Sequence, residues 1–107
     1  MSWKKNSEAA VKRFDAIAAV PGAKRGVMFG CPVYNLGKER YDILFEEKYV
    51  LRLSPEDSAA LIAKGGKPFE PIKGRKSKTA LVVPAAVAKS ERSLKAWLEK
   101  AVRFAQR

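Results

Sequence analysis

The sequence has 107 residues, 47% of them hydrophobic and 9% aromatic, which indicates one folded domain and excludes a disordered chain. It has one cysteine, no apolar run near the roughly 20 residues of a membrane-spanning helix and no apolar stretch typical of a signal peptide, so we expect a cytoplasmic protein without a membrane partner. The 22 Lys and Arg exceed the 11 Asp and Glu, and the resulting formal charge of +11 either favours an anionic partner or simply keeps the protein soluble.

The first element is predicted to be an amphipathic helix over residues 7–20. Ser7 is suited to cap its start, and Pro21-Gly22 ends it. The apolar side chains that recur at helical spacing and are expected to face the core are Val11, Phe14, Ile17 and Ala18.

A β-rich stretch follows between residues 27 and 53. Two short apolar runs, 27–30 and 32–34, lead to a turn at 35–38. Next, Tyr41, Ile43 and Phe45 alternate with Asp42, Leu44 and Glu46, which predicts a half-buried strand. A turn at Glu47-Lys48 then leads to another strand over 49–53. We expect three of these strands to form an antiparallel meander.

The clearest local signal is Ser54-Pro55-Glu56-Asp57, which predicts the start of a second helix. Serine can cap the first free amides, and proline has a preset φ that suits the first helical position. Gly65-Gly66 ends this helix. The prolines of segment 68–71 indicate an edge strand, and 79–83 predicts a strand that Pro84 terminates.

The last predicted helix begins near Ser90 and has a strong apolar stripe that we expect to pack on the sheet. Its members are Leu94, Trp97, Leu98, Ala101, Phe104 and Ala105. Residues 1–107 are thus expected to form one α+β domain. In it a small antiparallel sheet of about five strands, some of them short, is flanked by three helices in the order α-β-β-β-α-β-β-α.

The sequence offers little catalytic chemistry, so we do not expect an enzyme, a cofactor or a metal. It has no histidine, which excludes histidine-dependent triads and the commonest metal ligand. Cys31 has no histidine to activate it, so we expect a buried structural thiol. Asp42, Glu46 and Glu47 are interpreted as solvated strand-edge charges. Arg52 is expected to be half-buried and paired with an acid such as Asp42 or Glu46.

The basic residues are concentrated in the second part of the chain. Residues 1–63 contain ten basic and eight acidic residues, whereas 64–107 contain twelve basic and three acidic ones. A loop at 73–78 and one side of the last helix could contact phosphates without reading bases. The alternative is a solvated loop and helix face. The candidate nucleic-acid-binding residues are Lys73, Arg75, Lys76, Lys78, Lys100, Arg103 and Arg107.

An ordered series of short motifs from about Glu8 to Ala105 resembles the N-terminal domain of the TfoX/Sxy competence regulators. The series comprises Val27-Met28-Phe29-Gly30, Gly37-Lys38, Leu51-Arg52-Leu53-Ser54-Pro55-Glu56, Pro68-Phe69, Gly74-Arg75, Lys78, Val82-Val83 and Leu94 to Trp97. At Cys31-Pro32 the chain departs from the family, in which a second glycine is common.

The resemblance implies an α+β fold with a small antiparallel sheet flanked by helices, and no catalytic residues. Full-length regulators of this kind also have a helical C-terminal domain and assist the transcription of DNA-uptake genes through a partner activator. Our first hypothesis is therefore a non-enzymatic regulatory or adaptor domain that acts by contact with a protein partner. The alternative is weak, sequence-independent binding of nucleic acid, with DNA as the partner, and the third is a small-molecule enzyme. The sequence leaves the oligomeric state open.

Overall fold

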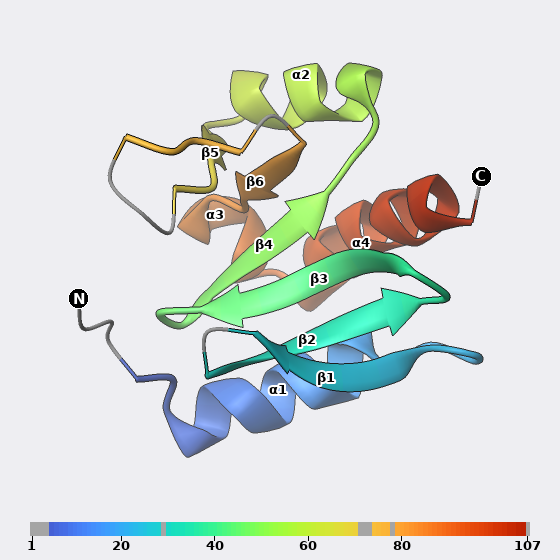
Figure 1. Cartoon of the computed structure of the whole chain (residues 1–107). Helices are drawn as coiled ribbons and strands as arrows, with labels where there is room; N and C mark the ends of the chain where they lie inside the picture. Colours follow the sequence, from blue (N-terminus) through green and yellow to red (C-terminus); the bar gives the residue numbers. More distant parts are fainter. Residues whose placement is uncertain (1–4, 29, 71–73, 78, 107) are drawn as a thin grey trace.

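An antiparallel sheet of six strands forms the centre of the fold, and four helices accompany it in the computed structural model, which describes residues 5–28, 30–70, 74–77 and 79–106 (Figure 1). The elements in chain order are α1 (Glu8–Ala18), β1 (Lys24–Met28), β2 (Cys31–Leu36), β3 (Glu39–Phe45), β4 (Lys48–Arg52), α2 (Pro55–Ala63), β5 (Lys67–Pro68), β6 (Ala80–Val82), α3 (Ala85–Ala88) and α4 (Glu91–Ala105).

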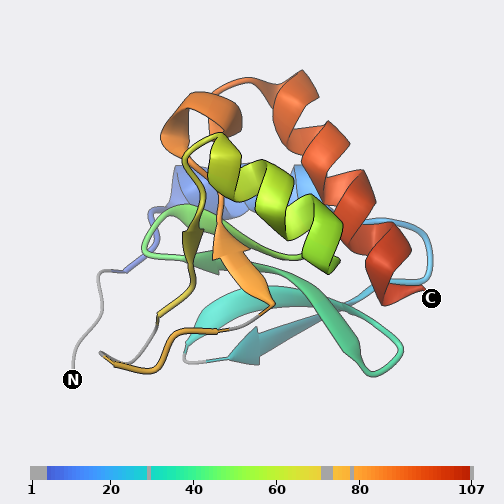
Figure 2. The same ribbon diagram turned by 90° about the horizontal axis from the view of Figure 1, so that it is seen from above.

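The strands lie in the order β1-β2-β3-β4-β6-β5, so the first four form a meander and β6 joins it beside β4. The position of β5 at the edge confirms the prediction for the proline-containing segment, since Pro68 cannot donate a hydrogen bond to a second neighbour. All four helices lie on one side of the sheet, here called the helix face (Figure 2). Each of them contributes buried side chains to the same core. The other side is called the loop face.

The predicted starts of α1 and α2 are confirmed by their capping hydrogen bonds, whereas α1 ends at Ala18, before the predicted end at residue 20. Ser7 Oγ accepts a hydrogen bond from the Ala10 amide at 3.1 Å, and Ser54 Oγ accepts one from the Asp57 amide at 3.2 Å. After α2 the Gly66 amide donates to the Leu61 carbonyl at 2.9 Å. A β-carbon at Gly66 would lie 2.9 Å from Leu61 Cγ, so the end of this helix requires glycine.

The main core lies between the helices and the helix face. From α1 and α4 it contains most of the two predicted apolar stripes, because Phe14, Ile17, Ala18, Leu94, Trp97, Leu98 and Ala101 are all buried. Aromatic rings continue this core into the sheet, where Phe14 lies 5.4 Å from Tyr34 and 5.8 Å from Tyr49 between ring centroids. Tyr41 Oη donates a hydrogen bond to the Ala18 carbonyl and so ties β3 to α1.

A second, smaller core lies on the loop face. It contains Cys31, Val33, Ile43, Phe45, Val50, Phe69 and Ala80. Phe69 lies in the segment that connects β5 to β6, and its ring packs edge-on against that of Phe45, with 5.1 Å between the ring centroids. The prediction that β3 is half-buried is therefore wrong, because the segment that connects β5 to β6 covers the loop face of this strand, where solvent contact was expected. Cys31 is buried as predicted, and burial raises the pKa of its thiol.

The prediction of a solvated carboxylate at Asp42 is wrong as well. The register between β2 and β3 shifts by one residue, with Tyr34 opposite Asp42 and Asn35 opposite Arg40, so Tyr41 is the extra residue of a β-bulge. Asp42 lies in the β3–β4 ladder opposite Leu51, which belongs to the main core. Its side chain is accordingly on the helix face and only 1% exposed.

The α+β class is confirmed, with one more strand and one more helix than expected among the described residues. The first strand begins at Lys24, earlier than predicted, because its first residues are polar and do not resemble an apolar strand. Phe29 of the predicted 27–30 run lies outside the described residues. The additional helix, α3, has only four residues and no side-chain cap, so it left little signal. No described helix has both the length and the apolar character needed to cross a membrane.

Candidate anion-binding site on the loop face

Two arginines from neighbouring strands lie together at one end of the loop face. Arg40 comes from β3 and Arg52 from β4, and both line a cavity of about 150 Å³. Strand alternation explains the position of Arg52, since its neighbour Leu51 is buried on the helix face. The bulge explains the position of Arg40. Regular alternation would place Arg40 and Ile43 on opposite faces, but the extra residue of the bulge places both on the loop face.

Of the two guanidinium groups, only that of Arg52 forms an ion pair within the described residues, with the carboxylate of Glu39. Arg52 Nη1 donates to Glu39 Oε2 at 3.0 Å, and these side chains are 34% and 38% exposed. Arg52 Nε is buried and has no hydrogen-bond partner in the described part of the chain. The pairing predicted with Asp42 or Glu46 is thus wrong. Asp42 belongs to the lining of the cavity, but its side chain turns to the opposite face with Leu51, and Glu39 supplies the carboxylate instead.

Arg40 is held without a carboxylate in the described structure. Its Nη1 lies 3.1 Å from the Sδ of Met28, and a thioether is only a weak acceptor. Burial, followed by the positive charge of Arg52, lowers the pKa of Arg40. Two like charges near each other in a partly buried position are unfavourable alone, and an anion between them would relieve the repulsion.

Two hydroxyl groups, from the segment that connects β5 to β6, also line the cavity. Ser77 Oγ accepts hydrogen bonds from the amides of Ala80 at 3.0 Å and Thr79 at 3.3 Å, so its own proton remains able to donate. Thr79 lies beside it on the rim. Guanidinium and hydroxyl donors are the groups that bind oxyanions such as phosphate.

The predicted basic loop adjoins this cavity. Arg75 and Lys76 are exposed and directly precede Ser77, whereas Lys73 and Lys78 lie outside the described residues. Gly74 has a positive φ of 88°, and its amide donates to Glu70 Oε2 at 2.7 Å, which fixes the turn before Arg75. The loop therefore contributes two described, exposed cations in the segment that leads to Ser77, although neither lines the cavity itself.

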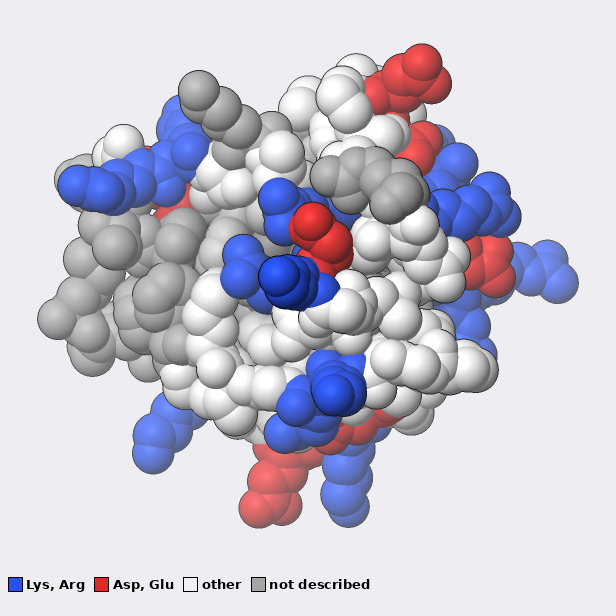
Figure 3. Space-filling view, turned by 45° about the vertical axis from the view of Figure 1, so that its right-hand side comes forward, with Lys and Arg blue, Asp and Glu red and all other residues white. Residues whose placement is uncertain are grey.

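The part of the predicted site that lies on α4 is elsewhere. Lys100 Nζ lies 3.7 Å from an oxygen of Asp57 in α2 and 5.6 Å from the ring centroid of Trp97. Arg103 lies 3.9 Å from Glu99, and Arg107 is outside the described residues. Because α4 packs on the helix face, the structure does not bring these residues together with the loop. Lys and Arg form several separate groups on the face seen in Figure 3, with acidic side chains between them.

Sequence reasoning missed Arg40 and Glu39 as site residues and treated Arg52 only as a paired strand residue. One signal in the sequence could have indicated the pair. Glu39-Arg40 begins β3 and Arg52 ends β4, and these ends lie side by side when the two strands pair antiparallel. Arg40 and Arg52 reach the same face only because of the β-bulge at Tyr41, and no residue type in the sequence predicts a bulge at that position. In the described ranges, no group of three or more His, Cys, Asp or Glu could hold a metal ion.

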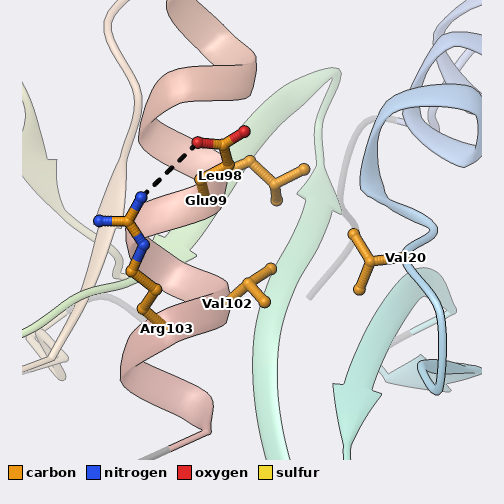
Figure 4. Close-up of a pocket in the computed structure, with 5 residues that line it drawn as sticks. All are labelled: Val20, Leu98, Glu99, Val102 and Arg103. Atoms are coloured by element: carbon orange, nitrogen blue, oxygen red, sulfur yellow. Dashed lines mark ion pairs between the residues drawn. The ribbon is translucent and has the colours of Figure 1, made fainter.

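A second hollow, of about 160 Å³, lies between α4 and the segment that follows α1 (Figure 4). Its apolar wall is made by Val20, Leu98 and Val102, whose side chains point toward the gap. The Glu99–Arg103 ion pair lies along its rim. The hollow is large enough for one aliphatic side chain and offers no described polar group inside it.

No family model matches the sequence, and comparison with curated proteins and with solved structures likewise gave no match. The resemblance to the TfoX/Sxy N-terminal domain therefore stays a prediction.

Proposed function

We propose that this chain is a non-enzymatic, cytoplasmic binding domain of regulatory type that holds nucleic acid through its phosphates, without reading the base sequence. The observation that carries the proposal is the Arg40–Arg52 pair, which converges on one cavity with only Glu39 as a described carboxylate partner. Arg75 and Lys76 extend the positive surface beyond the cavity.

The chemistry of these residues fits a phosphate backbone. A guanidinium presents several N–H donors in a planar fork that matches phosphate oxygens, and Arg52 Nε lacks a partner among the described residues. The formal charge of +11 attracts a polyanion and increases the rate of encounter. Contacts of this kind position a duplex without discriminating its bases, so we expect little sequence preference.

Fluorescence anisotropy with a short generic DNA duplex at several salt concentrations tests the proposal. If Arg40, Arg52, Arg75 and Lys76 each neutralise one phosphate, the log-log salt slope is about −3.6, and affinity falls about 10²-fold between roughly 50 and 200 mM salt. The double variant Arg40→Gln/Arg52→Gln should make the slope shallower by about 1.8.

A matched control is available on α4. Arg92 and Lys95 are exposed there, and Arg92→Gln/Lys95→Gln removes the same total charge from the helix side of the molecule. This variant should leave the slope unchanged. Absence of binding at low salt would overturn the proposal, and so would an equal loss of affinity in both double variants, which would indicate attraction by net charge alone.

Contact with a partner protein is the second candidate, and the hollow beside α4 favours it. An apolar hollow of about 160 Å³ suits one aliphatic side chain from an adaptor's partner, with the Glu99–Arg103 pair at its rim. Nuclear magnetic resonance distinguishes the two candidates. Binding of a protein here shifts the methyl signals of Leu98 and Val102, whereas binding of DNA to the loop face perturbs Ile43 and Val50 instead.

A further inference from the structure

A further hollow with an apolar wall and charged groups around it lies outside the site just described. It has a volume of about 440 Å³ and lies where the β3–β4 turn approaches the segment around α3. Val82, Pro84 and Ala85 contribute to its apolar wall. Small-molecule sites are usually concave, mostly apolar and between roughly 300 and 1,000 Å³, so the volume is sufficient for a ligand.

Four cationic side chains from different parts of the chain surround this hollow. They are Arg13 of α1, Lys48 of β4, Lys67 of β5 and Lys89 after α3. None of the four forms an ion pair with another described residue. Glu47 is the single acidic residue of the lining, and its Oε1 accepts a hydrogen bond from the Ser7 amide at 3.1 Å. The lining therefore has a clear positive excess.

Arg13 is the most firmly positioned of the four cations. Its Nη2 donates to the Ala88 carbonyl at 2.7 Å, and its guanidinium carbon lies 5.8 Å from the centroid of the Tyr49 ring. These contacts hold the guanidinium at the wall while leaving other N–H groups able to donate. The exposed lysines contribute mobile charges at the rim, which suit an anionic group more than a neutral one.

We propose that this hollow is a binding site for a small organic phosphate with a planar apolar body, the chemistry of a nucleoside monophosphate. The apolar wall would accept the ring, and Arg13 with the rim lysines would hold the phosphate. The site is separate from the Arg40–Arg52 cavity, since the two cavities share no lining residue, and it does not depend on the proposed binding of nucleic acid.

Isothermal titration with adenosine 5′-monophosphate tests this site, with adenosine and inorganic phosphate as partial ligands. Saturable one-to-one binding of the monophosphate is expected, at least about tenfold tighter than that of either fragment, because each fragment lacks one half of the interactions. Lys48→Gln/Lys89→Gln should weaken the monophosphate about tenfold. Both lysines are exposed, so this variant is expected to fold.

Two controls separate this site from the other one. Arg40→Gln/Arg52→Gln removes the same charge from the loop-face cavity and should leave binding of the monophosphate unchanged, while Lys48→Gln/Lys89→Gln should leave the salt slope for DNA unchanged. The proposal is overturned if the monophosphate does not bind saturably, if inorganic phosphate binds as tightly, or if the two double variants weaken it equally. None of these results alters the test of DNA binding.

Discussion

Asp42 lies directly opposite Leu51 in the β3–β4 ladder, so a carboxyl group shares the helix face with one of the most buried leucines of the core. Within the described residues no well-aligned donor reaches either carboxyl oxygen of Asp42, and the backbone of Ile43 offsets only part of the cost of its burial. Burial raises the pKa of Asp42 well above its usual range. A buried, unpartnered carboxylate is costly, so this residue opposes folding at neutral pH.

The first prediction concerns the pH dependence that Asp42 imposes on stability. Because the folded-state pKa is raised above the unfolded value, the protonated group contributes its full stability below the unfolded pKa, and this contribution is lost as pH rises through the folded pKa. Asp42→Asn removes the titration. We expect the variant to exceed the parent protein by about 1–3 kcal/mol in free energy of unfolding at neutral pH, with the difference shrinking toward pH 4.

Urea denaturation at a series of pH values measures that difference. Glu99→Gln is a useful control, because Glu99 is a highly exposed carboxylate and its replacement should change stability little at any pH. A difference between Asp42→Asn and the parent protein that does not grow with pH would show that the carboxyl group has the same pKa in the folded and the unfolded chain, as a solvated group does.

The second prediction concerns the turn between β3 and β4. Glu46 and Glu47 have φ values of 50° and 66°, and they form a two-residue connection in which both residues adopt the left-handed conformation. This conformation costs non-glycine residues roughly 1–2 kcal/mol, and Asn-Gly is the pair best suited to such a turn. Glu46→Asn/Glu47→Gly should therefore raise the free energy of unfolding by about 1–2 kcal/mol.

Thermal and urea unfolding measure the effect of the turn, and Glu46→Ala/Glu47→Ala provides the matched control. The alanine pair removes the same two charges and the same side-chain contacts, including the bond from the Ser7 amide to Glu47, but keeps the β-carbons that make the conformation unfavourable. Equal stability of the two double variants would mean that backbone strain at this turn is negligible.

The helices were predictable because their signals are local. Ser7 and Ser54 form the caps that their residue types indicated, and Gly66 ends α2 where a side chain would clash with Leu61. Most of the predicted apolar stripe of α4 is buried for the same reason, since helical periodicity is encoded in neighbouring turns, while Phe104 and Ala105 near its end are only half-buried. The β3–β4 turn was displaced by one residue in the prediction, because Glu46-Glu47 lacks the glycine or asparagine that marks such turns.

The candidate site was less predictable because it depends on non-local pairing. The bulge at Tyr41 changes which residues of β3 share a face, and that change moves Asp42 into the core. Coverage of the loop face by Phe69 depends on a path through space that alternation along β3 does not reveal. Similarly, Lys100 and Arg75 looked equivalent as basic residues, but one packs on Trp97 and the other lies exposed in the loop that leads to Ser77.

The third prediction concerns Glu39, which occupies part of the guanidinium of Arg52. If a phosphate binds in this cavity, the carboxylate competes with it for Arg52 and repels it. Glu39→Gln should therefore increase affinity for a DNA duplex about two- to fivefold, corresponding to about 0.5–1 kcal/mol for a partly exposed ion pair. Anisotropy at low salt measures the change.

The control for Glu39 is a carboxylate with a similar partner on the other side of the molecule. Glu99 lies 3.9 Å from Arg103, and Glu99→Gln makes the same change in net charge. It should affect DNA affinity much less than Glu39→Gln does. An equal increase in both variants would mean that net charge, rather than the Arg40–Arg52 cavity, determines affinity.

The fourth prediction separates packing from binding at Lys100. Its Nζ lies between Asp57 and the Trp97 ring, so the side chain connects α2 to α4 even though it is 41% exposed. Lys100→Ala should lower the free energy of unfolding by about 1 kcal/mol, a modest value because solvent screens both contacts. Lys95→Ala removes the same charge from an exposed position of α4 and should leave stability nearly unchanged.

Urea denaturation measures the stability of both variants, and DNA anisotropy measures their affinity. The two variants should bind DNA equally well, because α4 packs on the face opposite the arginine cavity. A salt slope shallower by about 0.9 in Lys100→Ala alone would instead place Lys100 at the nucleic-acid interface and require the bound duplex to reach the helix side of the molecule.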